Sequence, residues 1–450
     1  MEEQMDMREL MDFLDEGVTC YHAVRELEHR LRADGFEKLS ESSLWTLEPG
    51  GAYYTVRNDS SLMAFRVPSC AVKDIKGFHV YAAHSDSPAF KLKENPELTK
   101  EGAYVALNTE KYGGMIMSTW MDRPLTIAGR VCVEQDGAIV PYPIKLKDNV
   151  CMIPNLAIHM NRDINNGAAL NAQTDMLPLL MLKSETVASE SNASETQNEE
   201  TAGAINVMLA EALTAQTGRQ YRAEDILASD LFVENSQKAV LAGACDEFIM
   251  SARYDDLACV FAGMKAMLEA KSNDYINVLA VFDNEEVGSL TRQGADSTLL
   301  RDTLENIADG LGVTGAICRT WRAGSFMVSA DNAHACHPNQ GAKADPVNRP
   351  YLNKGIVLKY HGSQKYATDA CSAAGVKSIC KKHDIPVQIY TNRSDIAGGS
   401  TLGNLAMAQA SMAAADIGLP QLAMHSAYET AGVKDIEYLL CFAKAFFISA

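Results

Sequence analysis

Short apolar segments alternate with helix-patterned segments over most of the second half of the chain. The segment at 276–282 is almost entirely apolar, and further strand-like segments follow at 325–330 and 387–391. Helix-patterned stretches such as 255–270 lie between them. Strands that alternate with helices form a mainly parallel sheet with helices on both faces. The sequence therefore predicts an α/β fold with a doubly wound, mainly parallel sheet.

The middle of the chain has a different pattern. From about residue 94 to about residue 235, short β-like stretches are separated by Gly, Pro and Asn, and no long helix is expected before 202–217. A chain of 450 residues is also longer than one ordinary core requires. We therefore predict one domain formed by 1–93 plus 236–450, interrupted by an inserted β-rich domain at 94–235.

Two local segments allow narrower predictions. The opening residues, up to about residue 32, have the apolar spacing of a single amphipathic helix. The stretch at 184–200 is acidic and of low complexity. Such a composition cannot bury enough apolar surface to fold, so we expect a solvated loop without a catalytic role.

Composition excludes several classes of protein. The formal net charge is -18, which opposes sequence-independent binding to nucleic acid. No apolar run approaches the roughly 20 residues that span a bilayer, and the acidic start of the chain does not resemble a signal peptide. The eleven cysteines include no CxxC pair, as expected of reduced thiols in the cytoplasm. We predict a cytoplasmic protein without nucleic-acid or membrane partners.

Residues with metal-binding or acid–base side chains stand at or just past several predicted strands. Ligands of open α/β sheets bind beyond the carboxyl ends of the strands. These positions hold His84, Asp86, Asp255, Asp256, Asp283, Glu285, Glu286, Asp331 and His425. Each alone has an ordinary structural explanation, such as a carboxylate that caps a helix. Their convergence on one edge of one sheet would instead assemble imidazole and carboxylate ligands without thiolate, which is typical of a hydrolytic metal site.

Other hydrolase and cofactor motifs are missing or misplaced. There is no HExxH and no GxSxG, which argues against a zincin and against a serine hydrolase. The segment at 310–315 matches GxGxxG but follows a helix-patterned stretch instead of a strand. It therefore does not predict dinucleotide binding.

An ordered set of segments resembles one family of enzymes over nearly the whole chain. That family is the aspartyl aminopeptidase and aminopeptidase I metallopeptidases. The matching segments are AAHSDSP at 82–88, IPNLAIHMNR at 153–162, SARYDDL at 251–257, FDNEEVGS at 282–289, SADNAHACHPN at 329–339, LKYHGSQKYATDA at 358–370, GGSTLG at 398–403 and QLAMHS at 421–426. The resemblance implies a metallo-aminopeptidase with a catalytic domain and an inserted dimerisation or lid domain.

The resemblance also implies the metal centre. Each subunit would bind two divalent ions, with zinc expected and manganese or cobalt as alternatives. The implied ligands are His84, Asp255, Glu286, Asp331 and His425. Asp255 would bridge the two ions. His84 and Asp331 would bind the same ion, or the reverse pairing with Glu286 and His425 would hold. Glu285 would be the general base, and Asp86 would orient the His84 imidazole. The chain departs from its relatives at Asp256, where they commonly have Asn.

Substrate recognition is implied at three further residues. His159, supplied by the inserted domain of a neighbouring subunit, and Lys359 would bind the carboxylate of an acidic N-terminal residue. His334 would stabilise the oxyanion. A site completed by a neighbour requires a homo-oligomer, and the family forms a tetrahedral dodecamer built from dimers.

Three alternatives stay open. The same chemistry could serve neutral N-terminal residues such as Leu, as in the vacuolar branch of the family. A carboxypeptidase or deacylase could use the same two-metal architecture. A catalytically silent oligomeric scaffold is the alternative outside enzymes, but the chain retains all five implied ligands and Glu285.

Overall fold

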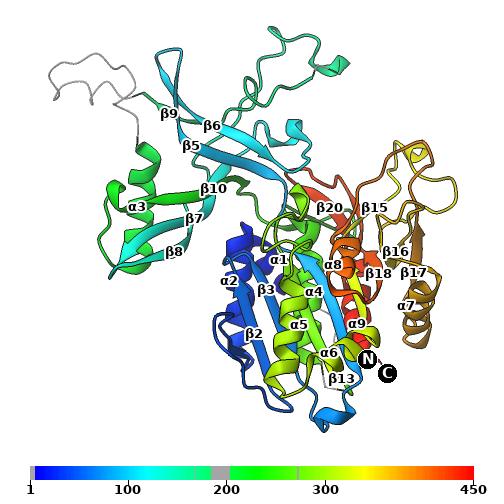
Figure 1. Cartoon of the computed structure of the whole chain (residues 1–450). Helices are drawn as coiled ribbons and strands as arrows, with labels where there is room; N and C mark the ends of the chain where they lie inside the picture. Colours follow the sequence, from blue (N-terminus) through cyan, green and yellow to red (C-terminus); the bar gives the residue numbers. More distant parts are fainter. Residues whose placement is uncertain (1–5, 168, 184–202, 271–272, 450) are drawn as a thin grey trace. The chain divides into compact units, whose positions relative to one another are not determined.

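A computed structural model describes residues 6–167, 169–183, 203–270 and 273–449 (Figure 1). The chain divides into two compact units. Unit 1 comprises Met1–Ser87, Ala239–Met424 and Glu429–Ala450, and unit 2 comprises Pro88–Lys238 and His425–Tyr428. The acidic stretch at 184–200, predicted to be a solvated loop, lies outside the described residues.

Unit 1 contains a nine-stranded sheet with central parallel strands. In order across the sheet, its strands are β1 (Glu37–Lys38), β2 (Ala52–Arg57), β3 (Ser61–Arg66), β13 (Tyr275–Phe282), β4 (Gly77–His84), β14 (Phe326–Ala330), β18 (Ala413–Gly418), β16 (Ile356–Lys359) and β17 (Val387–Tyr390). The central strands β13, β4, β14 and β18 run parallel to one another. On either side, β3 and β16 run antiparallel to their central neighbours. The architecture is therefore mixed α/β.

Both faces of this sheet are buried. All eight residues of β4 are buried, and successive side chains of a strand point to opposite faces. Val80 and Ala82 accordingly pack into one apolar core, whereas Tyr81 and Ala83 pack into the other. A strand with apolar residues on both faces requires helices on both sides of the sheet.

The helices of unit 1 supply those two cores. They are α1 (Met7–Glu16), α2 (Cys20–Ala33), α4 (Tyr254–Glu269), α5 (Leu299–Gly310), α6 (Gly315–Ala323), α7 (Ala370–Lys382), α8 (Leu402–Ala410) and α9 (Val433–Phe447). Side chains of α1, α2, α4, α7 and α9 enter one core, and those of α5, α6 and α8 enter the other. The GxGxxG segment at 310–315 runs from the end of α5 to the start of α6.

The prediction of a single N-terminal helix is wrong. Two helices occupy this region, and they are separated at Gly17. The Gly17 N–H closes α1 on the carbonyl of Phe13, and a Cβ at Gly17 would lie 2.8 Å from Leu257 Cδ1. Thr19 then begins α2 in an extended conformation, with its carbonyl accepting the Ala23 N–H. The apolar spacing is helical on both sides of the break, so it did not reveal the break.

Unit 1 also contains a five-stranded sheet. Its strands, in order, are β11 (Val240–Ala242), β12 (Phe248–Ser251), β20 (Glu429–Gly432), β19 (Pro420–Leu422) and β15 (Ala333–His334). This sheet corrects the expectation that all the candidate residues follow strands of one sheet. The strand before Asp255 is β12 and the strand before His425 is β19, and both belong to the smaller sheet. In the large sheet, β14 has β18 as a parallel neighbour. The Ala-rich sequence of β18 has low β-propensity, so it was not predicted as a strand.

Unit 2 is a β-rich body with one long helix among the described residues. Its antiparallel sheet has the order β8 (Ala138–Lys145), β7 (Leu125–Gln135), β10 (Ala228–Asn235), β5 (Ala89–Lys100), β6 (Tyr104–Tyr112) and β9 (Leu179–Leu182). The long helix is α3 (Ala204–Thr217), whose buried residues include Leu209 and Leu213. In the described parts of both units, no helix is long and apolar enough to cross a membrane.

Candidate metal centre

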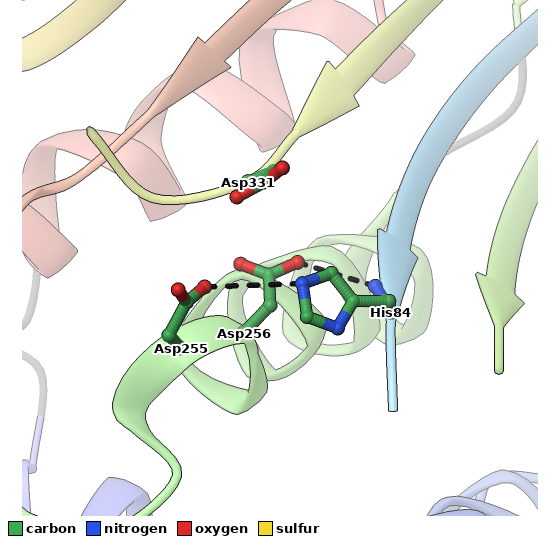
Figure 2. A group of neighbouring side chains, drawn as sticks. All are labelled: His84, Asp255, Asp256 and Asp331. Atoms are coloured by element: carbon green, nitrogen blue, oxygen red, sulfur yellow. Dashed lines mark hydrogen bonds and ion pairs between the residues drawn. The ribbon is translucent and has the colours of Figure 1, made fainter. Parts of the chain in front are cut away.

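Three neighbouring parallel strands of the large sheet end in residues of the candidate site. His84 is the last residue of β4, Asp283 directly follows β13, and Asp331 directly follows β14. Because β13, β4 and β14 are adjacent and parallel, their carboxyl ends meet at one edge of the sheet. The start of α4 brings Asp255 and Asp256 to the same edge (Figure 2).

Four buried side chains form the centre of this site. His84, Asp255, Asp256 and Asp331 each offer one ligand atom, and these atoms all lie within 4.8 Å of one another. Figure 2 shows the three carboxylates around the His84 imidazole. The His84 Nε2 atom lies 3.8 Å from Asp255 Oδ1, and the His84 backbone N–H donates to Asp256 Oδ2 at 3.2 Å. The arrangement is a compact set of imidazole and carboxylate donors.

A second group adjoins the first through His84. Ligand atoms of His84, Glu285 and Glu286 also lie within 4.8 Å of one another. Glu285 and Glu286 stand in the short 3-10 helix η6 (Glu285–Val287), which follows β13. Asn284 precedes it with φ 61°, a left-handed conformation that Asn tolerates better than most residues. This turn redirects the chain at the sheet edge.

Asp86 connects the two groups. Its carboxylate accepts the backbone N–H of Glu285 at 3.1 Å and that of Glu286 at 3.2 Å. The His84 Nδ1 atom lies 3.0 Å from the Asp86 carbonyl oxygen and 3.4 Å from Asp86 Oδ1. An Nδ1–H that donates to these oxygens leaves Nε2 as the free ring nitrogen, which is the tautomer that a metal ligand needs.

The pKa values of the cluster report a surplus of negative charge. Burial lowers the pKa of the His84 imidazole, but Asp86 and the nearby carboxylates outweigh burial and raise it well above its usual range. Burial raises the pKa of the Asp256 carboxyl, and that of the Glu285 carboxyl, well above their usual ranges. Like charges held together away from water favour the uncharged form of each group.

Lys359 lies beside Asp331. Its side chain is almost fully buried, with 2% of the residue exposed. The ammonium donates to the backbone carbonyls of Asp331 and Asn332 at 2.8 and 2.9 Å, and it lies 3.7 Å from Asp331 Oδ1. Burial lowers the pKa of Lys359, but the Asp331 carboxylate and the other acidic groups nearby together outweigh burial, and the net pKa is raised. Lys359 therefore carries a positive charge at the edge of the cluster.

Comparison with known proteins identifies the chain. The sequence model described as "Aminopeptidase I zinc metalloprotease (M18)" matches residues 13–447. The chain belongs to the M18 family. It is therefore a metallo-aminopeptidase, a hydrolase that acts on peptides.

Individual M18 relatives extend the match over almost the full length. The probable M18 family aminopeptidase 2 of Clostridium acetobutylicum is 42% identical over 436 residues, which cover 96% of each chain. The protein with the same description from Clostridium novyi is 41% identical over 441 residues, which cover 98% of each chain. Both matches span the two units.

Solved structures share the fold. A chain in the cryo-EM structure of the Ape4 and Nbr1 complex matches with a TM-score of 0.92 and 34% identity, covering 98% of this chain and 85% of that one. The S. cerevisiae mApe1 dodecamer matches with a TM-score of 0.80 and 27% identity, covering 98% of this chain and 95% of that one. The mixed α/β fold of this M18 aminopeptidase is therefore that of the family.

The side chains present fit a divalent cation. Those of unit 1 are one imidazole and five carboxylates, namely His84, Asp255, Asp256, Asp331, Glu285 and Glu286. Asp256 Oδ1 is buried and has no hydrogen-bond partner among the described residues. Burying several carboxylates together is costly unless a cation neutralises them. Oxygen and imidazole donors without thiolate suit zinc, manganese or cobalt.

The three other implied residues of the site are histidines. His334 is an exposed residue at the end of β15, with its ring centroid 6.0 Å from that of Tyr390. His159 is an exposed residue of unit 2. His425 belongs to the short segment grouped with unit 2, where its Nδ1 lies 2.6 Å from the Gly114 carbonyl oxygen. The roles of these three histidines stay predictions.

Two residues of the site were not assigned roles from the sequence. Asp256 stood out only as a departure from the commonly found Asn, and the structure places its carboxylate inside the donor cluster. Glu429 accepts the backbone N–H of Asp255 at 3.0 Å. It is 174 positions away along the chain, and no motif or spacing linked the two residues.

Proposed function

We propose that this M18 aminopeptidase binds two divalent ions per subunit and removes acidic N-terminal residues from peptides. The proposed ligands are those implied by the family resemblance: His84, Asp255, Glu286, Asp331 and His425. The observation that carries the proposal is the meeting of two donor groups at His84, one with Asp255 and Asp331 and one with Glu285 and Glu286. We propose zinc as the ion, because the family is described as zinc metalloproteases.

The roles of the chain's own residues follow from their positions. Bound ions of this kind polarise a peptide carbonyl and acidify a water molecule. Glu285 takes the proton of the attacking water and passes it to the leaving amine. Its place beside His84 and Glu286 supports this role, because a general base must lie within reach of the proton that it takes. Asp86 keeps Glu285 in place through the backbone and orients His84.

Specificity for an acidic residue rests on positive charge. Lys359 supplies a buried positive charge next to Asp331, and His159 and His334 are the further residues implied by the resemblance. A second candidate specificity, for neutral residues such as Leu, is favoured by one observation. The Lys359 ammonium already donates to the carbonyls of Asp331 and Asn332, which leaves only one of its three N–H groups for a substrate.

Hydrolysis of Asp-, Glu- and Leu-p-nitroanilide by zinc-loaded protein separates these specificities. We expect release from the Asp and Glu substrates, loss of that release on adding a chelator, and little turnover of the Leu substrate. Lys359→Met should then reduce kcat/KM for the acidic substrates. Turnover of the Leu substrate alone would contradict the acidic specificity and leave the metal chemistry intact. No turnover with metal bound would favour the oligomeric scaffold.

We also propose that the subunits form a tetrahedral dodecamer built from dimers, with unit 2 as the dimerisation or lid domain. The segment around His159 in the sequence exposes several apolar side chains, namely Met152, Leu156, Ile158 and Met160. Exposed apolar side chains that gather in a patch are typical of protein interfaces. A matching S. cerevisiae structure is described as a dodecamer. Sedimentation of the purified protein should give twelve times the mass of one chain.

The doubly wound sheet and the cytoplasmic location stay predictions.

A further inference from the structure

The chain enters α4 through a turn that is not helical. Arg253 has φ 56°, and Asp255 has φ -82° and ψ 111°. Tyr254, Asp255 and Asp256 are nonetheless buried. Buried peptide groups outside regular structure need hydrogen-bond partners from elsewhere, because an unpaired group loses its bonds to water.

Three side chains from distant parts of unit 1 supply those partners. The Asn332 side-chain amide donates to the Tyr254 carbonyl at 3.2 Å. Glu429 Oε2 accepts the Asp255 N–H at 3.0 Å. The Ser87 hydroxyl donates to the Asp255 carbonyl at 2.8 Å. The peptide groups on both sides of the Asp255 Cα atom are therefore held by side chains that come from other elements.

A buried carboxylate is an unusual acceptor for the backbone N–H of a residue in a carboxylate cluster. Glu429 is the first residue of β20, where it lies opposite Ser251 of β12, and it is only 2% exposed. It brings another buried negative charge to the backbone of a residue that already belongs to a carboxylate cluster. A hydrogen bond from an amide to a carboxylate is roughly twice as strong as one to a neutral acceptor. The bond to the Asp255 N–H is one of the contacts that compensate for burying Glu429.

We propose that Glu429 is a positioning residue that fixes the backbone of Asp255 and so aims the Asp255 carboxylate into the metal centre. The inference rests on the proposed role of Asp255 as a metal ligand. The direction of a side chain is set by the backbone atoms around its Cα. Without the bond to Glu429, the Asp255 amide loses its partner and the turn can relax. The carboxylate then leaves the position at which it meets His84 and Asp331.

Zinc affinity of the full chain tests this role without a peptide substrate. Glu429→Ala removes the acceptor, and Glu429→Gln keeps an acceptor oxygen but not the charge. Competition with a chromophoric zinc chelator should show affinity about 10–100-fold weaker for Glu429→Ala, the loss typical of residues that orient metal ligands. Glu429→Gln should retain most of the wild-type affinity. The kcat of Glu429→Ala should recover at excess zinc, with KM for the peptide unchanged.

A matched control separates positioning from loss of stability. Asp435 is also a buried carboxylate that accepts backbone N–H groups, those of Asn353 and Gly355. Asp435→Asn should lower the melting temperature without weakening zinc binding. If Glu429→Ala does not fold, Glu429→Leu, which fills a similar volume without an acceptor, takes its place.

Two results would overturn the inference about Glu429. One is wild-type zinc affinity in Glu429→Ala or Glu429→Leu, and the other is an equal loss of affinity in Asp435→Asn. A wild-type chain that binds no zinc would instead remove the proposed metal centre itself, and the inference with it. The two failures are therefore distinguishable in the same titration.

Discussion

Glu285→Gln is expected to lower kcat by about 10²–10⁴-fold, the contribution of a well-placed general base. The amide has the shape of the carboxylate but cannot accept the proton of the attacking water. Because Glu285 is proposed as a base and not as a ligand, the zinc content should stay at the wild-type level. Steady-state kinetics and metal analysis of the same sample measure both quantities.

A matched substitution on the surface provides the control. Glu305→Gln makes the same change on an exposed residue of α5 and should leave kcat unchanged. A Glu285→Gln enzyme that keeps its kcat would show that another group accepts the proton. A Glu285→Gln protein that loses its zinc would instead assign Glu285 to the ligands.

Asp255→Ala is expected to abolish both zinc binding and activity. Asp255 is proposed as the carboxylate shared by the two ions, so its removal takes a ligand from each. The remaining carboxylates of the buried cluster would then repel one another with less cation to neutralise them. Metal analysis after dialysis against a fixed free-zinc concentration should find little or no bound ion.

Asp309→Ala, an exposed change at the end of α5, is the corresponding control and should bind zinc as the wild type does. Two ions retained by Asp255→Ala would contradict the bridging role. One retained ion would show that Asp255 serves a single ion, and that the division of ligands differs from the one proposed here.

The location of the donor cluster was predictable because it depends on local patterns. The strands that end at His84 and precede Asp283 and Asp331 are apolar on both faces, so their limits and burial can be read from composition. Once those strands are parallel neighbours, their carboxyl ends meet at one edge. The structure brings His84 and Asp331 together in this way, and Asp255 joins them from the start of α4, which follows a strand of the smaller sheet.

What the sequence did not reveal depends on contacts between distant residues. The Asp86 carboxylate reaches the Glu285 N–H across 199 positions, and Glu429 reaches Asp255 across 174. The spacing of apolar residues along the chain contains no information about such contacts. The break at Gly17 was also hidden, because the apolar spacing is helical on both sides of it. The close approach of Leu257 to Gly17 is likewise a contact between distant residues.

The surroundings of Lys359 show the same limit. The family resemblance implied a cation that binds the substrate carboxylate. The structure surrounds Lys359 with the carbonyls of Asp331 and Asn332, the two residues between β14 and β15. Whether a lysine is buried depends on tertiary packing, so it cannot be predicted from the neighbouring residues in the sequence.

We propose that this M18 aminopeptidase works through two metal ions held at the edge of the unit 1 sheet. A titration of metal-free wild-type protein with zinc, in which bound zinc and hydrolysis of Asp-p-nitroanilide are followed together, tests this proposal directly. We expect saturation at two ions per chain and activity that appears only as they bind. Hydrolysis by the metal-free protein would contradict catalysis by two metal ions. An Asp255→Ala protein that binds zinc as the wild type does would show that the ions are not held at these carboxylates.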